Sequence, residues 1–385
     1  MSPRFVKLGD LIDVLSGFAF KSEYFNDSDG LPVIRIRDVV RGYSDTYYSG
    51  SYTEPFIVVN DDILIGMGGN FNAAKWRGGR ALLNQRVCKV TAKQALLDEG
   101  YLYHYLPIVL KKIEDATPFV TVKHLSAGDL RDEFIPLPSL PEQRRIAAIL
   151  DKADALRTKR REALAQLDRL AQAIFVEMFG DPVSNPKGWP VFAVSDLPIH
   201  IADGNYSSKY PSSAEFVNAG VPFIRANNLS NLTVKPNEMR FITDEKHREL
   251  AKGHLLEDDV LICTRGEIGR VGMVPPEFAG ANINAQLVLL RPKNNTILPD
   301  YLCHLLNSVT MNRYVRTFET GVALKQLPIH ALKRILIPTP PSDLQIEFAL
   351  QVRTIQRKRL PYSSANFKTE SLFTSLQHRA FREEL

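Results

Sequence analysis

The feature that most constrains this chain is that it repeats itself once over nearly its whole length. Segments of the first half recur in the same order in the second half, at an offset of about 190–202 residues. The matched segments are Gly30–Ile36 with Gly220–Ala226, Asp61–Ile65 with Asp258–Ile262, Tyr101–His104 with Tyr301–His304, and Ile135–Pro138 with Ile337–Pro340. Gln143 then falls on Gln345. A period of about 200 residues is far too long for a solenoid, so we interpret the chain as a duplicated two-part unit.

Length and composition set the class of protein. The chain has 385 residues, which predicts two or three domains at roughly 100–200 residues each. Hydrophobic residues make up 44% and charged residues 24%, as in ordinary globular proteins, so a disordered or collagen-like chain is excluded. The net charge of +5 permits nucleic-acid binding without arguing for it, because a local basic face matters more than the total.

Cysteine usage and hydropathy indicate the compartment. Cys88, Cys263 and Cys303 are far apart and form no Cys-x-x-Cys motif, so neither a disulfide framework nor a structural metal site is expected. No run of about 18 or more apolar residues could span a membrane, and the N-terminus lacks the apolar core of a signal peptide. We therefore expect a soluble cytoplasmic protein without a membrane partner.

Each repeat consists of a mixed front followed by a helical tail. The fronts contain short β-branched runs bounded by Gly, Pro, Asn and Asp, as strands do, for example Pro32–Ile36 and Val260–Ile262. Each front ends with a shorter helical stretch, over 97–113 and 298–316, and then with a proline-rich stop. The expected division is a front over 1–140, a helix and linker over 141–185, a second front over 186–340 and a C-terminal helix over 341–385.

The tail of the first repeat predicts one long helix. It begins at Pro141, a residue suited to the first helical turn, and contains no further Gly or Pro before Gly180. At 1.5 Å per residue, a helix of about 39 residues is roughly 58 Å long. Apolar residues alternate in spacing between four and three, which indicates a coiled-coil seam with Leu156, Leu167 and Leu170 as structural positions. The seam comprises Ile149, Ala153, Leu156, Ala163, Leu167, Leu170 and Ile174, interrupted only by Arg160.

The tail of the second repeat begins near Ser342 and contains Pro361, so we expect a C-terminal helix broken near that proline. A seam needs a partner, and the best candidate for each tail is the other tail, paired antiparallel. The alternative, that each tail packs only on its own front, explains a strict 4,3 repeat less well. The expected fold is α+β, with two homologous mixed α/β fronts separated by a pair of long antiparallel coiled-coil helices in a pseudo-twofold arrangement.

Familiar catalytic motifs are missing from the chain. It contains no P-loop, no His-Glu-x-x-His zinc helix and no Gly-x-Ser-x-Gly elbow. Gly66-Met-Gly-Gly69 lacks dinucleotide-binding spacing and is better explained as a hairpin or loop. The pattern favours a binding protein over a catalyst, with no catalytic, cofactor-binding or metal-binding residues assigned.

In each front, a predicted strand that begins with two aspartates is followed by a polar, glycine-rich loop. These loops are Gly68–Arg80 and Thr264–Arg270. Arginine can pair bidentately with guanine and Asn or Gln with adenine, whereas Lys and backbone N–H groups suit phosphates. The aromatic rings of Trp76 and Phe71 could stack on bases. The alternative is an ordinary solvated loop with a buried Trp76; recurrence in both fronts supports binding. The candidate DNA-binding residues are Lys75, Arg77, Arg80 and Gln85 in the first front, and Arg265, Arg270, Asn284 and Gln286 in the second.

A second matched segment precedes the last strand of each front. Thr117–His124 contains Lys123, and Thr320–Gln326 contains Lys325. These lysines are further candidate DNA contacts, and a capped turn is an equally acceptable explanation.

Three segments resemble the specificity subunit of type I restriction–modification systems. They are Pro136–Leu150 leading into the long helix, Met178–Pro182 with Asn185–Trp189, and Leu376–Phe381. The tandem order of front, helix, front and helix also resembles that family, over nearly the whole chain. Pro361 departs from a uniform second spacer helix.

This resemblance implies that each front is a target-recognition domain and that the helices form a two-stranded spacer. It implies a non-catalytic subunit that binds double-stranded DNA, two modification (methyltransferase) subunits and restriction (motor–nuclease) subunits. S-adenosylmethionine, ATP and Mg²⁺ would be bound by those partners, with no cofactor on this chain. Two other functions remain open: a coiled-coil protein-interaction adaptor without DNA readout, and a stand-alone nuclease or methylase.

Overall fold

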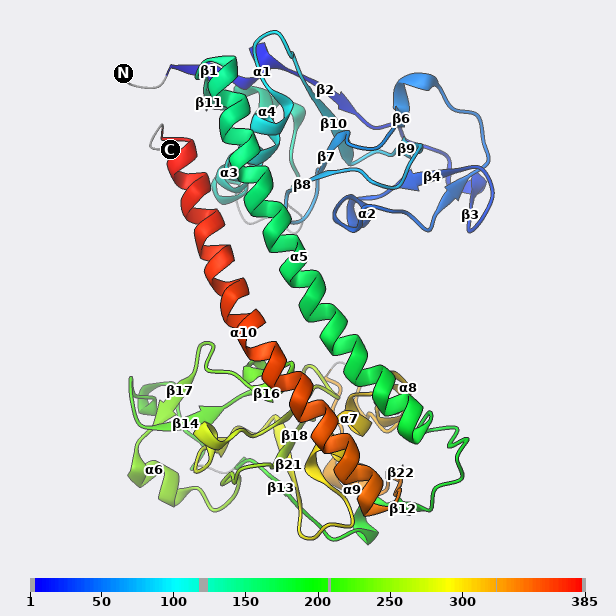
Figure 1. The fold of residues 1–385 in the computed structure, drawn as a ribbon, viewed down its shortest axis with the longest axis vertical. Coiled ribbons are helices and arrows are strands. Elements are labelled where there is room, and N and C mark those ends of the chain that lie inside the picture. Colours follow the sequence, from blue (N-terminus) through cyan, green and yellow to red (C-terminus); the bar gives the residue numbers. More distant parts are fainter. Residues whose placement is uncertain (1–3, 118–123, 207–208, 323, 383–385) are drawn as a thin grey trace. The chain divides into compact units, whose positions relative to one another are not determined.

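The computed structural model describes residues 4–117, 124–206, 209–322 and 324–382, and the chain folds into two compact units (Figure 1). The first unit comprises residues 1–161 and 364–385, and the second comprises residues 162–363. Each unit therefore combines one front of the repeat with part of each tail. None of the helices in the described ranges has both the length and the hydropathy needed to cross a membrane.

The first unit contains short strands and a few helices, in the order that the sequence predicts for a mixed front. Its strands are β1 (Phe5–Lys7), β2 (Ile12–Ser16), β3 (Phe25–Asn26), β4 (Leu31–Ile34), β5 (Tyr47–Tyr48), β6 (Ile57–Val58), β7 (Ile63–Gly66), β8 (Asn72–Lys75), β9 (Ala81–Leu83), β10 (Val87–Ala92) and β11 (Phe134–Pro136). Its helices are α1 (Leu8–Leu11), α2 (Ile36–Arg41), α3 (Glu99–Ala116) and α4 (Ala127–Asp132), with the beginning of α5 (Leu140–Phe179) and the end of α10 (Ser342–Ala380).

Two sheets form the body of the first unit. The antiparallel sheet has the strand order β2-β10-β7-β8, and the second has the order β3-β5-β4-β9-β6, in which β4 and β9 run parallel. Successive side chains of β7 point to opposite faces of the sheet, and the side chains on both faces are buried. Ile63 and Ile65 pack with Tyr101 of α3, whereas Leu64 packs with Trp76 on the other face. The sheet thus joins two apolar clusters.

The second unit repeats this plan. Its strands are β12 (Val191–Ala193), β13 (Ile199–Asp203), β14 (Val221–Ile224), β15 (Leu229–Ser230), β16 (Leu232–Val234), β17 (Arg240–Ile242), β18 (Val260–Cys263), β19 (Val271–Met273), β20 (Asn282–Ile283), β21 (Leu287–Pro292) and β22 (Leu336–Pro338). Its helices are α6 (Asp244–Glu249), α7 (Pro299–Asn307), α8 (Val309–Arg316) and α9 (Ile329–Lys333), with the remaining parts of α5 and α10.

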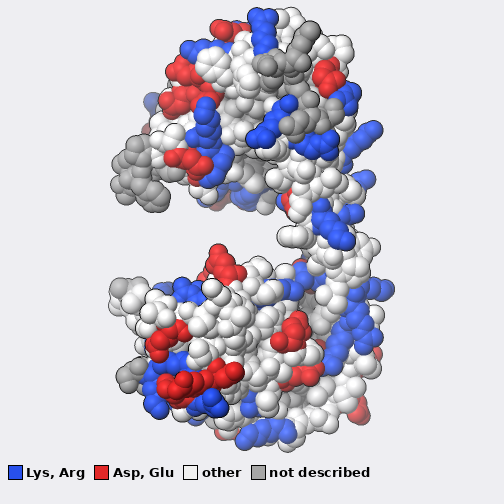
Figure 2. Space-filling model, turned by 90° about the vertical axis from the view of Figure 1, so that its left-hand side faces the viewer, with Lys and Arg blue, Asp and Glu red and all other residues white. Residues whose placement is uncertain are grey.

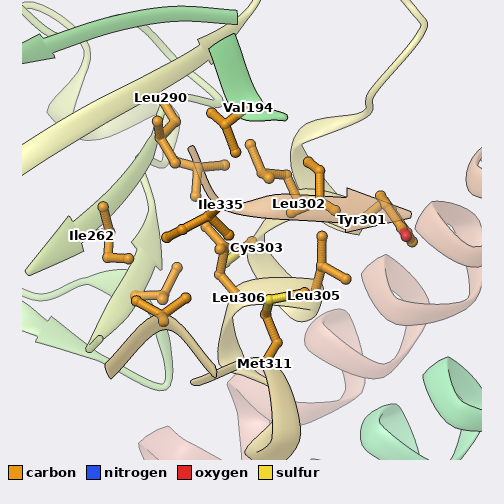
Figure 3. Packing of buried hydrophobic residues seen from close by; sticks show 14 of the residues in the cluster. Val194, Ile262, Leu290, Tyr301, Leu302, Cys303, Leu305, Leu306, Met311 and Ile335 are labelled. Atoms are coloured by element: carbon orange, nitrogen blue, oxygen red, sulfur yellow. The ribbon is translucent and has the colours of Figure 1, made fainter. Parts of the chain in front are cut away.

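The main sheet of the second unit has the order β13-β21-β18-β19-β16-β15. Val260 and Ile262 of β18 face one cluster, and Leu261 and Cys263 face another, as in β7. Figure 3 shows the first of these clusters, in which α7 residues pack against Ile262 and the other labelled side chains. The helical stretch expected over 298–316 is two helices, because Ser308 ends α7 and caps α8 by accepting from the Met311 backbone N–H (3.4 Å).

Helix α5 confirms the long helix expected from the sequence, and it ends at Gly180. That glycine has a φ of +79°, the left-handed conformation common after a helix C-terminus. The expected break near Pro361 is wrong, because α10 is one helix from Ser342 to Ala380. A proline inside a helix costs about 3 kcal/mol. Packing on either side of it offsets that cost, since Val352 and Ile355 lie in the core of the second unit and Phe373 lies in that of the first.

The two tails pair antiparallel in each unit. In the first unit, the Arg157 guanidinium lies 4.1 Å from the ring centre of Phe373, and Arg160 donates to Thr369. In the second unit, Arg359 pairs with Asp168 (3.0 Å). Residues later in α5 contact residues earlier in α10, so the two helices run in opposite directions. The prediction of an antiparallel pair is confirmed.

The expected seam is only partly correct. Leu167 packs against the core of the second unit, but Leu156 and Leu170 are 44% and 48% exposed, so their assignment to the seam is wrong. The inward positions include Arg157 and Arg160 instead. Their polar ends find partners on α10, which a search for apolar spacing does not detect.

A buried glutamine joins each front to its tail by the same three hydrogen bonds. The Gln143 amide accepts from the Asp98 backbone N–H (2.8 Å) and donates to the carbonyls of Leu96 (3.1 Å) and Pro138 (2.9 Å). Gln345 accepts from the Leu298 N–H (2.8 Å) and donates to the carbonyls of Thr296 (2.9 Å) and Pro340 (2.8 Å). The duplication therefore preserves the junction between front and tail.

Beside this junction, the acidic residue of a pair lies on the long helix in the first unit and on the front in the second unit. In the first unit, the His104 Nε2 lies 2.8 Å from the Asp151 carboxylate of α5. In the second unit, Arg353 of α10 takes the place of Asp151 and pairs with Asp300 of α7 (2.8 Å). The residue that matches Asp300 is Gly100, at which an added Cβ would lie 4.0 Å from the Asp151 carboxylate.

Candidate nucleic-acid interface

Three loops of the second unit meet where the inner strands β18 and β21 of its main sheet end and begin. The Thr264 N–H donates to the Gln286 carbonyl (2.8 Å), and the Leu327 N–H donates to the Thr264 carbonyl (2.9 Å). Arg265 also forms an isolated β-bridge with Gln326. We call the loops at 264–270 and 284–286, together with residues 320–322 and 324–327, the second loop cluster.

The first unit has the same backbone hydrogen bonds at the corresponding ends of its strands β7 and β10. The Met67 N–H donates to the Arg86 carbonyl (2.8 Å), and the Leu125 N–H donates to the Met67 carbonyl (3.1 Å). Gly68 forms the β-bridge with His124. The loops at 67–71, 84–86 and 124–125 are the first loop cluster. Gly66–Gly69 lies at the β7–β8 hairpin, as the sequence predicts.

Arg265 and Gln286 are brought together on the surface of the second loop cluster. Both side chains are exposed. The Arg265 guanidinium lies over the Tyr206 ring, 4.6 Å from its centre, and the Tyr206 hydroxyl donates to the Ala285 carbonyl (2.5 Å). Sequence reasoning missed this tyrosine. Its signal is the preceding Gly204, which packs against the Asn284 backbone just as Gly17 packs against that of Asn84.

Asn284 and Arg270 have partners within the protein. Asn284 is buried, and its amide donates to the Gln286 side-chain Oε1 (2.9 Å) while accepting from the Gln286 N–H (3.1 Å). The Arg270 guanidinium donates to the Ala226 carbonyl (3.2 Å) and pairs with Glu267. In this conformation, Asn284 orients Gln286 and Arg270 ties two loops together.

Lys325 lies in the second loop cluster with an exposed side chain, 3.4 Å from the Glu319 carboxylate. Val322 and Leu324 nearby are 99% and 89% exposed. Full exposure of two apolar side chains beside a lysine suits contact with a ligand that has both apolar and anionic parts.

One candidate in the first unit, Lys75, lies away from the first loop cluster. In the antiparallel β7–β8 hairpin, Ile63 pairs with Lys75 at the end opposite to the loop at 67–71. Lys75 lies 4.9 Å from the ring centre of Tyr103, while Arg77 and Arg80 follow farther along the chain. The Arg80 guanidinium is 4.0 Å from Glu54. Lys75 is therefore not brought together with Gln85, and no hydrogen bond or ion pair among the described residues joins Arg77 or Arg80 to Gln85.

The aromatic rings proposed for stacking are in the core. Trp76 is fully buried and its indole N–H donates to the Gly79 carbonyl (2.7 Å); Phe71 is also buried. Buried rings cannot stack on bases, so the prediction of stacking is wrong. The alternative, a loop with a buried Trp76, is correct.

The remaining first-unit candidates are Gln85 and Lys123. Gln85 is exposed on the first loop cluster, and Lys123 lies outside the described residues. Arg86, which was not a candidate, is exposed beside Gln85 and occupies the place of Gln286. Aligning Asn84 with Asn284 in the sequence would have identified it.

The second unit also contains a polar cavity of about 590 Å³. It lies where α5 and α10 face the β15–β16 hairpin, and its lining includes Asp168, Gln172, Asn227, Arg270 and Arg359. Within the described residues, no group of three or more His, Cys, Asp or Glu side chains could hold a metal ion.

Surface charge is mixed on both units. In the face shown in Figure 2, Lys and Arg alternate with Asp and Glu on each unit. No broad basic area covers this face of either unit, so recognition there would depend on individual side chains.

His304, which contacts this cavity, is expected to make the second unit sensitive to acid. Burial lowers the pKa of His304 from 6.5 to about 4, and its ring lies 5.1 Å from that of Phe348. Between these values only the unfolded chain binds the proton, so stability falls as the pH drops from 6.5 to 4, by about 3 kcal/mol at most.

His304→Leu is expected to weaken this pH dependence. The check is chemical unfolding at pH 7.5 and 4.5 for the wild type, His304→Leu and the exposed control His330→Gln. An identical loss of stability in all three proteins would contradict the assignment.

Comparisons with known proteins agree with this architecture. A family model described as "Type I restriction modification DNA specificity domain" matches residues 4–167 and 186–352. The chain is 30% identical to the EcoBI type I restriction enzyme specificity subunit of Escherichia coli, over 99% of this chain and 85% of that protein. It is 21% identical to the MjaVIII specificity subunit of Methanocaldococcus jannaschii, over 91% and 85% of the two chains.

The fold also matches a solved structure. The S subunit of a type I restriction–modification system from M. genitalium superposes with a TM-score of 0.58 at 17% identity, covering 99% of both chains. The two copies of the family model cover the two fronts of the repeat and the beginning of the long helix that follows each of them. The chain therefore belongs to the family of type I restriction–modification DNA specificity subunits.

Proposed function

We propose that this chain is the sequence-specific DNA-binding specificity subunit of a type I restriction–modification complex. Each front is a target-recognition domain that reads one half of a bipartite, asymmetric target. The observation that supports this most strongly is the pair of loop clusters, which share their backbone bonds but carry different side chains. Two related scaffolds with different surface groups suit two different half-sites.

The helix pair would set the gap between the half-sites. Both α5 and α10 contain residues of both units, and each is one helix over 40 and 39 residues. A change in the length of both helices should therefore alter the gap without altering the bases read by either front.

Catalysis would lie on partner subunits. We propose assembly with two modification subunits that use S-adenosylmethionine and with restriction subunits that use ATP and Mg²⁺, and no catalytic, cofactor or metal site on this chain. A coiled-coil adaptor without DNA readout is not favoured, because the family to which the chain belongs is one of DNA specificity domains.

Mapping methylated bases in cells that express the chain with its modification subunits tests this function. The expected result is a single asymmetric motif in two parts with an unspecified gap. A continuous motif, or no methylation that depends on this chain, would contradict it.

A seven-residue insertion in both helices, after Arg161 and after Ser363, is expected to lengthen the gap by up to about 3 base pairs and to leave both half-sites unchanged. The control inserts seven residues after Arg161 alone, which mismatches the helix pair and should abolish methylation. A changed half-site in the double insertion would contradict the proposed role of the helices.

A further inference from the structure

We propose that Arg86 and Gln286 are corresponding base-reading positions, at which the first front selects guanine and the second selects adenine. This inference rests on the proposed function and assigns one position of each half-site to one side chain. It concerns Arg86, which is not among the candidate residues chosen from the sequence.

The two residues occupy the same place in the backbone. Each follows the buried or half-buried asparagine of a tight turn, Asn84 or Asn284, by two residues. The turn closes with the Val87 N–H donating to the Asn84 carbonyl (3.1 Å) and the Leu287 N–H donating to the Asn284 carbonyl (3.2 Å).

The carbonyls of both positions also have equivalent partners. The Arg86 carbonyl accepts from Met67 and the Gln286 carbonyl accepts from Thr264. The strands that follow these positions, β10 and β21, each pair with a strand on both sides, so both positions are held by a hydrogen-bonded sheet.

Both side chains are available to a ligand. Arg86 is exposed, and no ion pair or side-chain hydrogen bond joins it to another described residue. Gln286 is exposed, and its Oε1 accepts from the Asn284 amide, which directs the amide and leaves its N–H₂ group as a donor. A carboxamide held in this way still has a second lone pair on its oxygen.

The turns differ in two respects. The Asn84 Oδ1 accepts from the Gln85 N–H (2.9 Å), whereas the Asn284 Oδ1 accepts from the Gln286 N–H (3.1 Å). Arg86 has a φ of +69°, in the left-handed region, whereas Gln286 is not among the residues with positive φ. The two hydrogen bonds therefore hold the backbone at Arg86 in a conformation that is unfavourable for any residue with a Cβ. The left-handed conformation is equally unfavourable for Arg and for Gln, so replacing Arg86 by Gln changes mainly the head group of the side chain.

The chemistry of the head groups gives the predicted bases. A guanidinium donates two hydrogen bonds to the O6 and N7 of guanine in the major groove. A carboxamide accepts from the N6 and donates to the N7 of adenine. Each such pair discriminates against the wrong base by roughly tenfold or more.

The test compares the methylated motif of the complex containing the wild-type chain with those containing Arg86→Gln and Gln286→Arg. Arg86→Gln is expected to change one position of one half-site from guanine to adenine, by about tenfold in relative methylation, and Gln286→Arg is expected to make the reverse change in the other half-site. Neither variant should affect the half-site read by the other front.

Arg86→Gly is the variant that separates reading from folding. Glycine relieves the left-handed conformation, so this protein should be at least as stable as the wild type while losing the preference at that position. A motif unchanged in all three variants, or methylation reduced equally at every sequence, would overturn the assignment, the latter because it indicates a phosphate contact. Failure of the wild-type complex to give a bipartite motif would instead contradict the proposed function.

Discussion

Replacing Phe348 by alanine is expected to lower the unfolding free energy of the second unit by about 3–5 kcal/mol. Phe348 of α10 is fully buried, and its ring packs edge-on against Phe175 (5.6 Å between centres) and Phe179 (5.2 Å) of α5. It also contacts His304 of α7. Truncation removes the ring at the point where both tails and the front share one core, and three elements would have to move together to fill the cavity.

Hydrogen exchange of β18 and β21 amides measures this loss locally, alongside urea unfolding of the whole chain. The matched control is Phe367→Ala, the same substitution in the same helix at a side chain that is 75% exposed. The control should change stability by less than about 0.5 kcal/mol. Equal effects of the two substitutions would contradict the packing described for α10.

Gln345→Leu is expected to destabilise the second unit by about 3 kcal/mol or more. The leucine would fill similar space but leave the Leu298 N–H and the carbonyls of Thr296 and Pro340 without their buried partner. Each unsatisfied buried group costs about 1–3 kcal/mol. Gln143→Leu should have the same effect in the first unit, because it makes the same three bonds.

Gln166→Leu is the control for both substitutions, since this glutamine is exposed on α5. Urea unfolding should show no loss for the control and a separate loss for each buried glutamine. If Gln345→Leu and Gln345→Glu were both as stable as the wild type, the hydrogen bonds would not hold front and tail together.

The long helix and the buried strands could be predicted because they depend on local sequence. A run without Gly or Pro over 142–179 leaves few alternatives to α5, and the short apolar run Ile63–Ile65 between Asp62 and Gly66 marks a strand. The break at Pro361 was wrong because a local penalty is smaller than the packing of Val352 on one side and Phe373 on the other. The phase of the seam was wrong because Arg157 faces α10 while Leu156 is exposed.

The loop clusters could be predicted only in part. Arg265 and Gln286 lie together as expected, because a short loop separates β18 from β19 and the turn before β21 returns beside it. Lys75 was misplaced because nearness in sequence does not say which end of a hairpin a residue occupies. Arg86 was missed because its side chain differs in chemistry from that of Gln286, although aligning Asn84 with Asn284 places the two residues at the same position.

The exchanged charges at the junctions limit how fronts can be transplanted. A chimera joined at the proline-rich stop would place Asp300 of the second front against Asp151 of α5, so two carboxylates would meet where the native proteins have an acid–base pair. The reciprocal chimera would leave Arg353 facing the position of Gly100, without Asp300, the nearer of its two acidic partners. A gene crossover that yields a stable recombinant should therefore fall beyond Asp151 or Arg353, so that the inherited cassette includes the first three turns of the helix.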